Sequence, residues 1–326
     1  MKKTLIIILT ALFICLSGCT RQNSAQDKVY RIEIIKQLDH ASLNEIADAI
    51  EAQLQKAAEE EGIGIEVYVT SGQNDAGILK QLADEAAASH PDAIIPIATL
   101  AAQVCVSSTM GTDIPVIFAA ISDPEEAGLT GMEKVTGTSD ALNTAFIIDM
   151  ILKQDPDVKK IGLLYSLSEA NSTNPIREAK QILEKKGIDC VEAAGNTSEE
   201  IISSAGVLIA QGVDAVFTPT DNVVMAAELA IAPMFVENGI PHYAGADSFV
   251  RNGAFATCGV NYTDLGTKTA DLAFKVIREG FEGIKDFYLM DGGIITVNRE
   301  TASALRLDPQ IFAEMGQLIV VDTSED

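Results

Sequence analysis

The sequence predicts an α/β protein of two doubly wound, Rossmann-like lobes joined by a hinge that the chain crosses three times. From Tyr30 onward, short apolar runs rich in β-formers alternate with helical stretches, in two consecutive blocks of similar size. The apolar runs lack inside–outside alternation, as expected for parallel strands whose two faces are both covered by helices. The chain has 326 residues, a length at which a single core usually gives way to two domains.

The first block predicts a strand, a helix and then further alternating elements. Ser42 is suited to cap the first helix, and Gly62 is suited to end it. The expected strands are 30–35, 65–70, 93–97 and 116–121, and the expected helices are 43–61, 76–89 and 99–110.

The second block repeats the pattern and supplies the second lobe. We expect strands at 160–165, 189–193, 215–218, 242–246 and 294–297, and helices at 143–153, 175–186, 198–210, 222–238 and within 259–280.

The predicted hinge consists of three segments at which the chain crosses between the lobes. The first is 135–139, and the others are 256–262 and 289–293. A few residues that absorb dihedral change suffice for such a hinge. The N-terminal lobe is then 29–138 plus 259–288, and the C-terminal lobe is 139–258 plus 289–326.

The N-terminus predicts export. Lys2 and Lys3 precede an apolar run at 4–16, which is typical of a signal peptide and short for a membrane span. The run from Leu16 to Cys19 (LSGC) resembles a bacterial lipobox, so we expect a signal peptide at 1–18, a lipidated Cys19 and a polar tether at 19–28. The chain would then lie outside the cytoplasm, anchored to the bacterial cell membrane. The alternative is a plain signal peptide with an incidental cysteine.

Composition excludes several classes of function. With 23 basic and 47 acidic side chains, the protein has no basic field for nucleic acid. Cys105, Cys190 and Cys258 are widely separated, and the histidines lack metal-ligand spacing, so we expect no metal and no cofactor. Buried thiols are favoured over a disulfide among these cysteines. Motifs of nucleotide-binding, hydrolase and metalloprotease sites are absent, and no enzyme is predicted.

Polar residues that follow the predicted strands are the candidates for ligand binding, because ligands of open parallel sheets bind beyond the carboxyl ends of strands. Each could instead be a helix cap, since the same residue types serve both roles. Asp247 is the stronger candidate, because the residues after it can cap themselves. The full set is Asp39, Thr99, Gln103, Ser122, Asp123, Ser139, Glu169, Asn171, Ser172, Asp221, Asn222 and Asp247.

Several runs of residues carry a resemblance to a known family. The run from Ile114 to Pro124 (IPVIFAAISDP) continues into Ala127–Leu129 (AGL) and 135–137 (VTG). Further matches are IPIATLAAQ at 95–103, GLLY at 162–165, SEANS at 168–172, TPTDN at 218–222 and GVNYTDLG at 259–266. Together they resemble ABC transporter substrate-binding proteins related to tryptophan/tyrosine-type receptors.

The resemblance implies a type I periplasmic binding protein fold and a monomer that delivers a small solute to membrane permease subunits. It implies an amino acid, aromatic or branched, whose amino group meets Asp247 or Asp123 and whose carboxylate meets Ser172. The first loop, 38–42, helps to shape the pocket for the side chain of the solute, and it departs from the usual pattern of the family. The resemblance therefore does not determine which side chain is bound. Rival interpretations are a nucleoside, sugar or peptide as the solute, a sensor for a membrane receptor, and an enzyme on the same fold.

Overall fold

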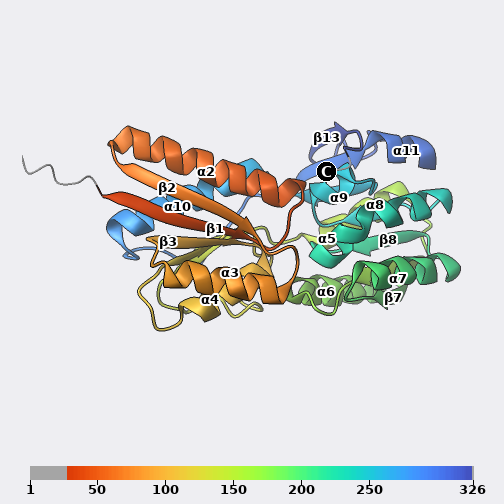
Figure 1. Ribbon diagram of the computed structural model, residues 1–326. Coiled ribbons are helices and arrows are strands. Elements are labelled where there is room, and N and C mark those ends of the chain that lie inside the picture. The colour runs from red at the N-terminus through yellow and green to blue at the C-terminus, as the bar shows by residue number, and fades with distance from the viewer. Residues whose placement is uncertain (1–27, 325–326) are drawn as a thin grey trace, which may run out of the picture.

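The computed structural model describes residues 28–324, and it shows two lobes joined at a narrow waist (Figure 1). The predicted signal peptide, Cys19 and almost all of the tether lie outside the described residues. Within residues 28–324, no helix has the length and apolarity needed to cross a bilayer.

The first lobe is built on a six-stranded sheet with the order β11-β5-β4-β3-β1-β2, in which every pairing is parallel. Helix α10 comes from late in the chain yet packs beside α2, as its blue ribbon among orange elements shows (Figure 1). The elements are β1 (Val29–Lys36), α2 (Ala41–Glu61), β2 (Gly64–Ser71), α3 (Ala76–Ala88), β3 (Ala93–Ile97), α4 (Thr99–Thr109), β4 (Val116–Phe118), β5 (Val135–Ser139), α10 (Tyr262–Glu279) and β11 (Tyr288–Leu289).

The second lobe is built on a seven-stranded sheet with the order β13-β12-β10-β9-β8-β6-β7. The pairing of β10 with β12 is antiparallel, and the other pairings are parallel. Its elements are α5 (Thr144–Gln154), β6 (Lys160–Tyr165), α6 (Ala170–Lys186), β7 (Asp189–Ala194), α7 (Ser198–Ala210), β8 (Ala215–Thr218), α8 (Asn222–Glu237), β9 (His242–Ala244), α9 (Asp247–Arg251), β10 (Ala256–Gly259), β12 (Ile294–Asn298), α11 (Arg299–Leu305) and β13 (Gln317–Val321). Two doubly wound α/β lobes are therefore confirmed.

The chain passes between the lobes after β5, after β10 and after β11. The segment 135–139, expected to be a hinge, is instead the fully buried strand β5. Its Thr and Gly residues suggest a turn, but Val135, Thr136 and Thr138 are β-branched and suit a buried strand. Gly137 is needed there, because a Cβ would lie 2.1 Å from the Phe118 carbonyl oxygen.

Other differences lie at element ends. Helix α6 begins at Ala170, five residues before the predicted start at Pro175, so the proline lies inside the helix. The short elements α9, β11, α11 and β13 were not predicted, because their brief patterns carry little periodicity.

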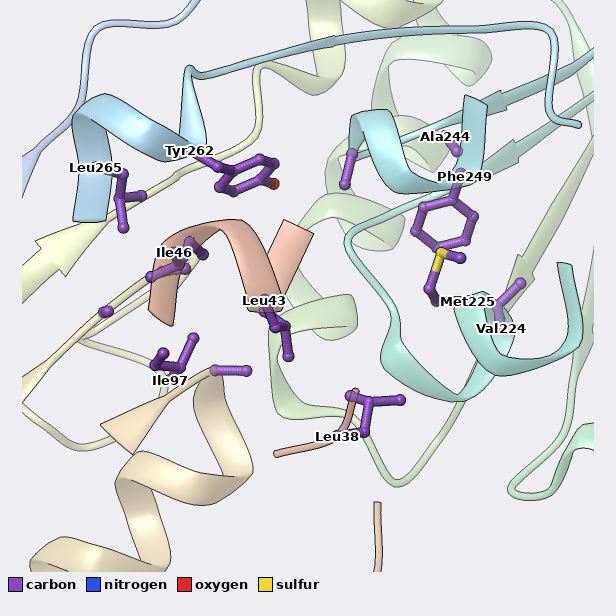
Figure 2. Packing of buried hydrophobic residues seen from close by; sticks show 14 of the residues in the cluster. Leu38, Leu43, Ile46, Ile97, Val224, Met225, Ala244, Phe249, Tyr262 and Leu265 are labelled. Carbon is purple, nitrogen blue, oxygen red and sulfur yellow. The ribbon is translucent and has the colours of Figure 1, made fainter. Parts of the chain in front are cut away.

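A hydrophobic cluster extends across the waist from one lobe to the other. Leu43 of α2 faces Met225 of α8 and Phe249 of α9 across the cleft (Figure 2). All three side chains are at most 5% exposed. The two lobes therefore bury apolar surface against each other, in addition to their own cores.

Candidate functional site

A cavity of about 30 Å³ lies between the lobes, at the carboxyl ends of strands from both sheets. Its volume holds a water molecule or two, so in this arrangement the walls nearly touch. Its walls are formed by His40, Ser42, Leu43, Ala98, Thr99, Ala120, Ser122, Asp140, Asn171, Thr220, Asp221, Asn222, Met225, Ala246, Ser248, Phe249 and Tyr262.

A chain of hydroxyl groups connects the lobes at the polar end of the cavity. Ser122 Oγ donates to Asp140 Oδ1 over 3.0 Å, and it lies 2.7 Å from Thr220 Oγ1 of the second lobe. Because the single Ser122 proton goes to the carboxylate, Thr220 is the donor in the second bond. Tyr262 donates to Asp140 Oδ2 over 3.4 Å. Asp140 therefore accepts hydrogen bonds but meets no cation among these partners.

Asp140 was not among the predicted site residues. It is 8% exposed, and burial raises the pKa of its carboxyl group. The residue directly follows β5, so the rule that ligands lie beyond strand ends would have found it. If 135–139 is taken as a hinge, Asp140 follows no strand, and the rule does not point to it.

Asp221 also borders the cavity, but its carboxylate is fully engaged by the protein. Oδ1 accepts from the backbone N–H groups of Val223 and Val224, which caps α8. Oδ2 accepts from Ser166 N at 2.7 Å and from Ser172 Oγ at 2.6 Å. Asp221 is therefore a helix cap, as the alternative interpretation of these residues allowed.

Glu169 is a buried carboxylate that joins the lobes beside the cavity. Its Oε1 accepts from Gln37 Nε2 of the first lobe at 2.7 Å, and its Oε2 accepts from Asn222 Nδ2 at 3.1 Å. Burial, and next the nearby Asp221 carboxylate, raise the pKa of Glu169 to about 7. Glu169 thus holds the lobes together through neutral amides alone.

Two cavity-lining alanines have backbone angles that L-residues avoid. Ala98, between β3 and α4, has φ 76° and ψ 163°, a region essentially reserved for glycine. Ala120, after β4, has φ 56°. Such conformations persist where the surrounding structure imposes them, and they gather at functional sites.

The structure brings together five of the twelve predicted residues: Thr99, Ser122, Asn171, Asp221 and Asn222 line the cavity. The other twelve residues of the cavity wall are outside the predicted set: His40, Ser42, Leu43, Ala98, Ala120, Asp140, Thr220, Met225, Ala246, Ser248, Phe249 and Tyr262. Many of these are apolar or lie on helices α2, α8, α9 and α10, and a search for polar residues after strands does not reach them.

Three other predicted residues of the first lobe lie away from the cavity wall. Asp39 is 55% exposed and pairs with Lys36. Gln103 donates to the Ala127 carbonyl oxygen at 3.1 Å. Ser139 is fully buried in β5.

The remaining four also lie outside the cavity wall, and each is held by other interactions: Asp123, Glu169, Ser172 and Asp247. Asp123 accepts from Glu126 N and from Asn174 of the second lobe. Ser172 donates to Asp221, and Glu169 bonds to Gln37.

Asp247 does not line the cavity either, because its carboxylate is engaged on both oxygens. Oδ1 accepts from Ser42 at 3.0 Å, and Oδ2 pairs with Arg251 at 2.9 Å. The helix α9 begins at Asp247, where the carboxylate contacts these partners. A role for Asp247 in taking an amino group is not supported by this geometry.

With the geometry established, comparison with known proteins decides the family. Residues 31–310 match the family described as ABC transporter substrate binding protein. The chain belongs to this family. By its description this is a family of substrate-binding proteins.

A relative in Clostridioides difficile, a tyrosine-binding protein, is 30% identical over 296 residues, which cover 89% of this chain and 85% of that protein. The solved structure of an ABC domain from Streptococcus pneumoniae in complex with L-Trp is 27% identical, with a TM-score of 0.82. The ligand-free, open structure of an adhesive substrate-binding protein from Clostridium difficile is 30% identical, with a TM-score of 0.66. Each match covers 90% of this chain and 100% of the solved chain.

The two TM-scores indicate how the lobes of this substrate-binding protein are arranged relative to each other. Although the open structure is the more similar in sequence, the L-Trp complex is the more similar in shape. The direct contacts between lobes, such as Ser122 with Thr220 and Gln37 with Glu169, agree with that. The structure therefore shows the closed arrangement of a type I periplasmic binding protein fold.

Proposed function

We propose that this protein captures an aromatic amino acid outside the cytoplasm and delivers it to the permease of an ABC importer. The observation that carries the proposal is the cavity enclosed by both lobes, with the Asp140 carboxylate at one end and apolar side chains along the wall. A zwitterion with an apolar side chain matches this distribution. The named ligands of the relatives, tyrosine and L-Trp, support the same class.

The α-ammonium group would bind at Asp140. This carboxylate faces the cavity without a cationic partner among its bonds, whereas Asp221 is saturated by four donors. Asn171 adds a second acceptor there. Its Nδ2 donates to the Thr220 carbonyl oxygen, so its buried Oδ1, which has no partner, is left to receive an N–H.

The α-carboxylate would bind near the start of α4. The N-cap residue of this helix, Ala98, has no side chain that could cap it, and although Leu100 N donates to Gln37 Oε1, other N–H groups of the first turn have no side-chain cap. Thr99, at the first position of the helix, lines the cavity with a hydroxyl group. Uncapped N–H groups and the helix dipole favour an anion at such an end. Ser172, which the resemblance suggested for this role, already donates to Asp221.

In this arrangement the cavity of about 30 Å³ has no room for an aromatic ring, so the lobes would separate to admit the solute and would close around it less tightly than they do here. A solute that contacts both lobes binds the closed form more tightly, and this difference in affinity shifts the equilibrium toward closure. The closed lobes would present a joint surface to the permease. Lipidation of Cys19 would keep the monomeric protein at the membrane beside that permease.

The test is thermal unfolding of the purified protein with a panel of amino acids, nucleosides and sugars. A ligand present at 100 times its Kd stabilises a protein by about 2.7 kcal/mol, which raises Tm by several degrees. We expect the shift only with aromatic amino acids. A shift with a nucleoside or a sugar instead would replace the proposed solute. If a solute binds but cells take it up equally well without this protein, a role as a sensor is favoured.

A further inference from the structure

Two polar atoms of the cavity wall, one from each lobe, have no hydrogen-bond partner. They are Nδ1 of His40, at the start of α2, and Oγ of Ser248, in α9. Both atoms are buried, and Ser248 as a whole is 1% exposed. A buried polar atom without a partner costs free energy, which a ligand group can recover.

Hydrogen bonds around His40 determine which of its ring nitrogens carries the proton. Gln37 Oε1 accepts from Leu100 N, so its amide nitrogen points to Glu169. Asn222 also directs its Nδ2 to Glu169, which leaves Asn222 Oδ1 facing His40 Nε2 at 3.5 Å. An amide oxygen only accepts, so Nε2 carries the hydrogen.

His40 Nδ1 is therefore a hydrogen-bond acceptor in the neutral ring. Burial lowers the pKa of His40 to about 4, which keeps the ring neutral at physiological pH. The partner that Nδ1 lacks must consequently be a donor, and the Ser248 hydroxyl can accept from the same donor or bind beside it.

A hydrogen bond links the two helices that carry this pair. The hydrogen bond from Ser42 Oγ to Asp247 Oδ1, at 3.0 Å, ties the start of α2 to the start of α9 and so brings His40 and Ser248 to the same part of the cleft. The next side chains on these helices, Leu43 and Phe249, are apolar and face each other (Figure 2). A donor reaching His40 would therefore belong to a group next to an apolar surface.

We propose that His40, with Ser248, recognises a hydrogen-bond donor on the side chain of the solute, so that the cavity selects tyrosine or tryptophan over phenylalanine. The inference rests on the proposed function and names what that site distinguishes. Phenylalanine would leave Nδ1 unpaired in a closed, dry cavity, and a site built to bind a substrate hydroxyl or N–H group discriminates strongly against an analogue that lacks it.

The experiment is isothermal titration of the wild-type protein and of His40→Ala and Ser248→Ala with L-tyrosine, L-tryptophan and L-phenylalanine. We expect the wild type to bind phenylalanine roughly 10- to 100-fold more weakly than tyrosine or tryptophan, the range expected for one unpaired buried group. In His40→Ala this ratio should fall toward 1 while the Kd of phenylalanine changes little. His90→Ala, at an exposed histidine, is the control and should keep the wild-type ratio.

The outcomes separate the inference from the proposed function. If the wild type binds all three amino acids equally, or if His40→Ala weakens all three by the same factor, the inference is overturned and the function stands. If none of the three binds to the wild type, the proposed function itself fails, and the inference fails with it.

Discussion

Ser122 and Thr220 are 98 residues apart and belong to different lobes, yet their hydroxyl oxygens lie 2.7 Å from each other. The bond completes a chain that ends on the Asp140 carboxylate. Gly245 makes this possible from the second lobe, because a Cβ at that position would lie 2.5 Å from Thr220 N. Closure of the lobes therefore builds the polar end of the cavity, and the state of the cleft and the environment of Asp140 change together.

Asp140→Asn should weaken solute binding by roughly 10- to 100-fold, because a hydrogen bond to a charged group contributes about 1.5–3 kcal/mol. Asparagine keeps the shape of the side chain and still accepts from Ser122. Because burial already raises the pKa of Asp140, removing the charge should not lower Tm. Calorimetric titration and a thermal melt of the same sample measure both quantities.

Asp39→Asn is the matched control for this substitution. Asp39 is exposed and pairs with Lys36 away from the cavity, so its variant should bind with the wild-type Kd. An Asp140→Asn protein that retains wild-type affinity would place the ammonium group elsewhere in the cleft.

Closure of the lobes should become weaker as the pH rises. In the closed form burial, and next the Asp221 carboxylate, raise the pKa of Glu169 to about 7. Separation of the lobes would expose the carboxylate and lower this pKa toward the ordinary value of 4.5, so the closed form is expected to bind more protons than the open form between these values. Closure is then fully favoured below about pH 4.5, weakens by up to about tenfold per pH unit through the window, and is constant above about pH 7. Small-angle X-ray scattering of the protein without solute, from pH 5 to pH 8, would show a rising radius of gyration.

Glu169→Gln isolates this effect. The variant cannot ionise, and its Nε2 replaces one of the two acceptors, so one of the bonds from Gln37 and Asn222 is lost. Its lobes should therefore close less firmly, but its radius of gyration should not change with pH across the range. Asp140 and Asp221, whose pKa values burial also raises, remain present in the variant. His40 is already neutral in this window. An unchanged pH profile in Glu169→Gln would assign the response to those aspartates instead.

Cys19→Ser should release the protein from the membrane. The expected diacyl group supplies about 0.8 kcal/mol for each buried methylene, and serine cannot carry it through a thioether. Fractionation of cells followed by detection of the protein in membrane and soluble fractions measures the change. Cys105→Ser is a suitable control, since Cys105 is a buried thiol within the fold and should leave the protein at the membrane. Wild-type protein that is found in the soluble fraction to the same extent as Cys19→Ser would indicate a plain, cleaved signal peptide.

The two-lobe fold could be predicted because its evidence is local. Runs such as 93–97 are apolar throughout, and helix α2 ends at Gly62, which has the left-handed conformation. The strand β5 could not, because Thr136 and Gly137 are equally typical of a turn, and only the neighbouring strand β4 makes them a buried strand.

The candidate site could be predicted only in part. Thr99 and Ser122 were found by their position after strands, but Asp221 and Asp123 share that position and serve chiefly as caps. A cap and a ligand contact use the same side-chain types, so the sequence does not separate them. His40 and Phe249 belong to opposite lobes, and their shared cavity depends on the closed arrangement.

Ala98→Gly should stabilise the protein, although glycine usually destabilises. Glycine costs about 0.4–1 kcal/mol through the entropy of the unfolded chain, whereas a residue held in a disfavoured backbone region costs about 1–3 kcal/mol. Ala98 has φ 76° and ψ 163°, so relief of strain should exceed the entropic cost by about 1 kcal/mol. Ala101→Gly makes the same change three residues later, inside α4, where the conformation is helical and glycine costs about 1 kcal/mol. Urea unfolding of both variants should therefore move the midpoint in opposite directions, upward for Ala98→Gly and downward for Ala101→Gly. A downward shift in both would mean that the backbone at Ala98 stores no strain that glycine can release.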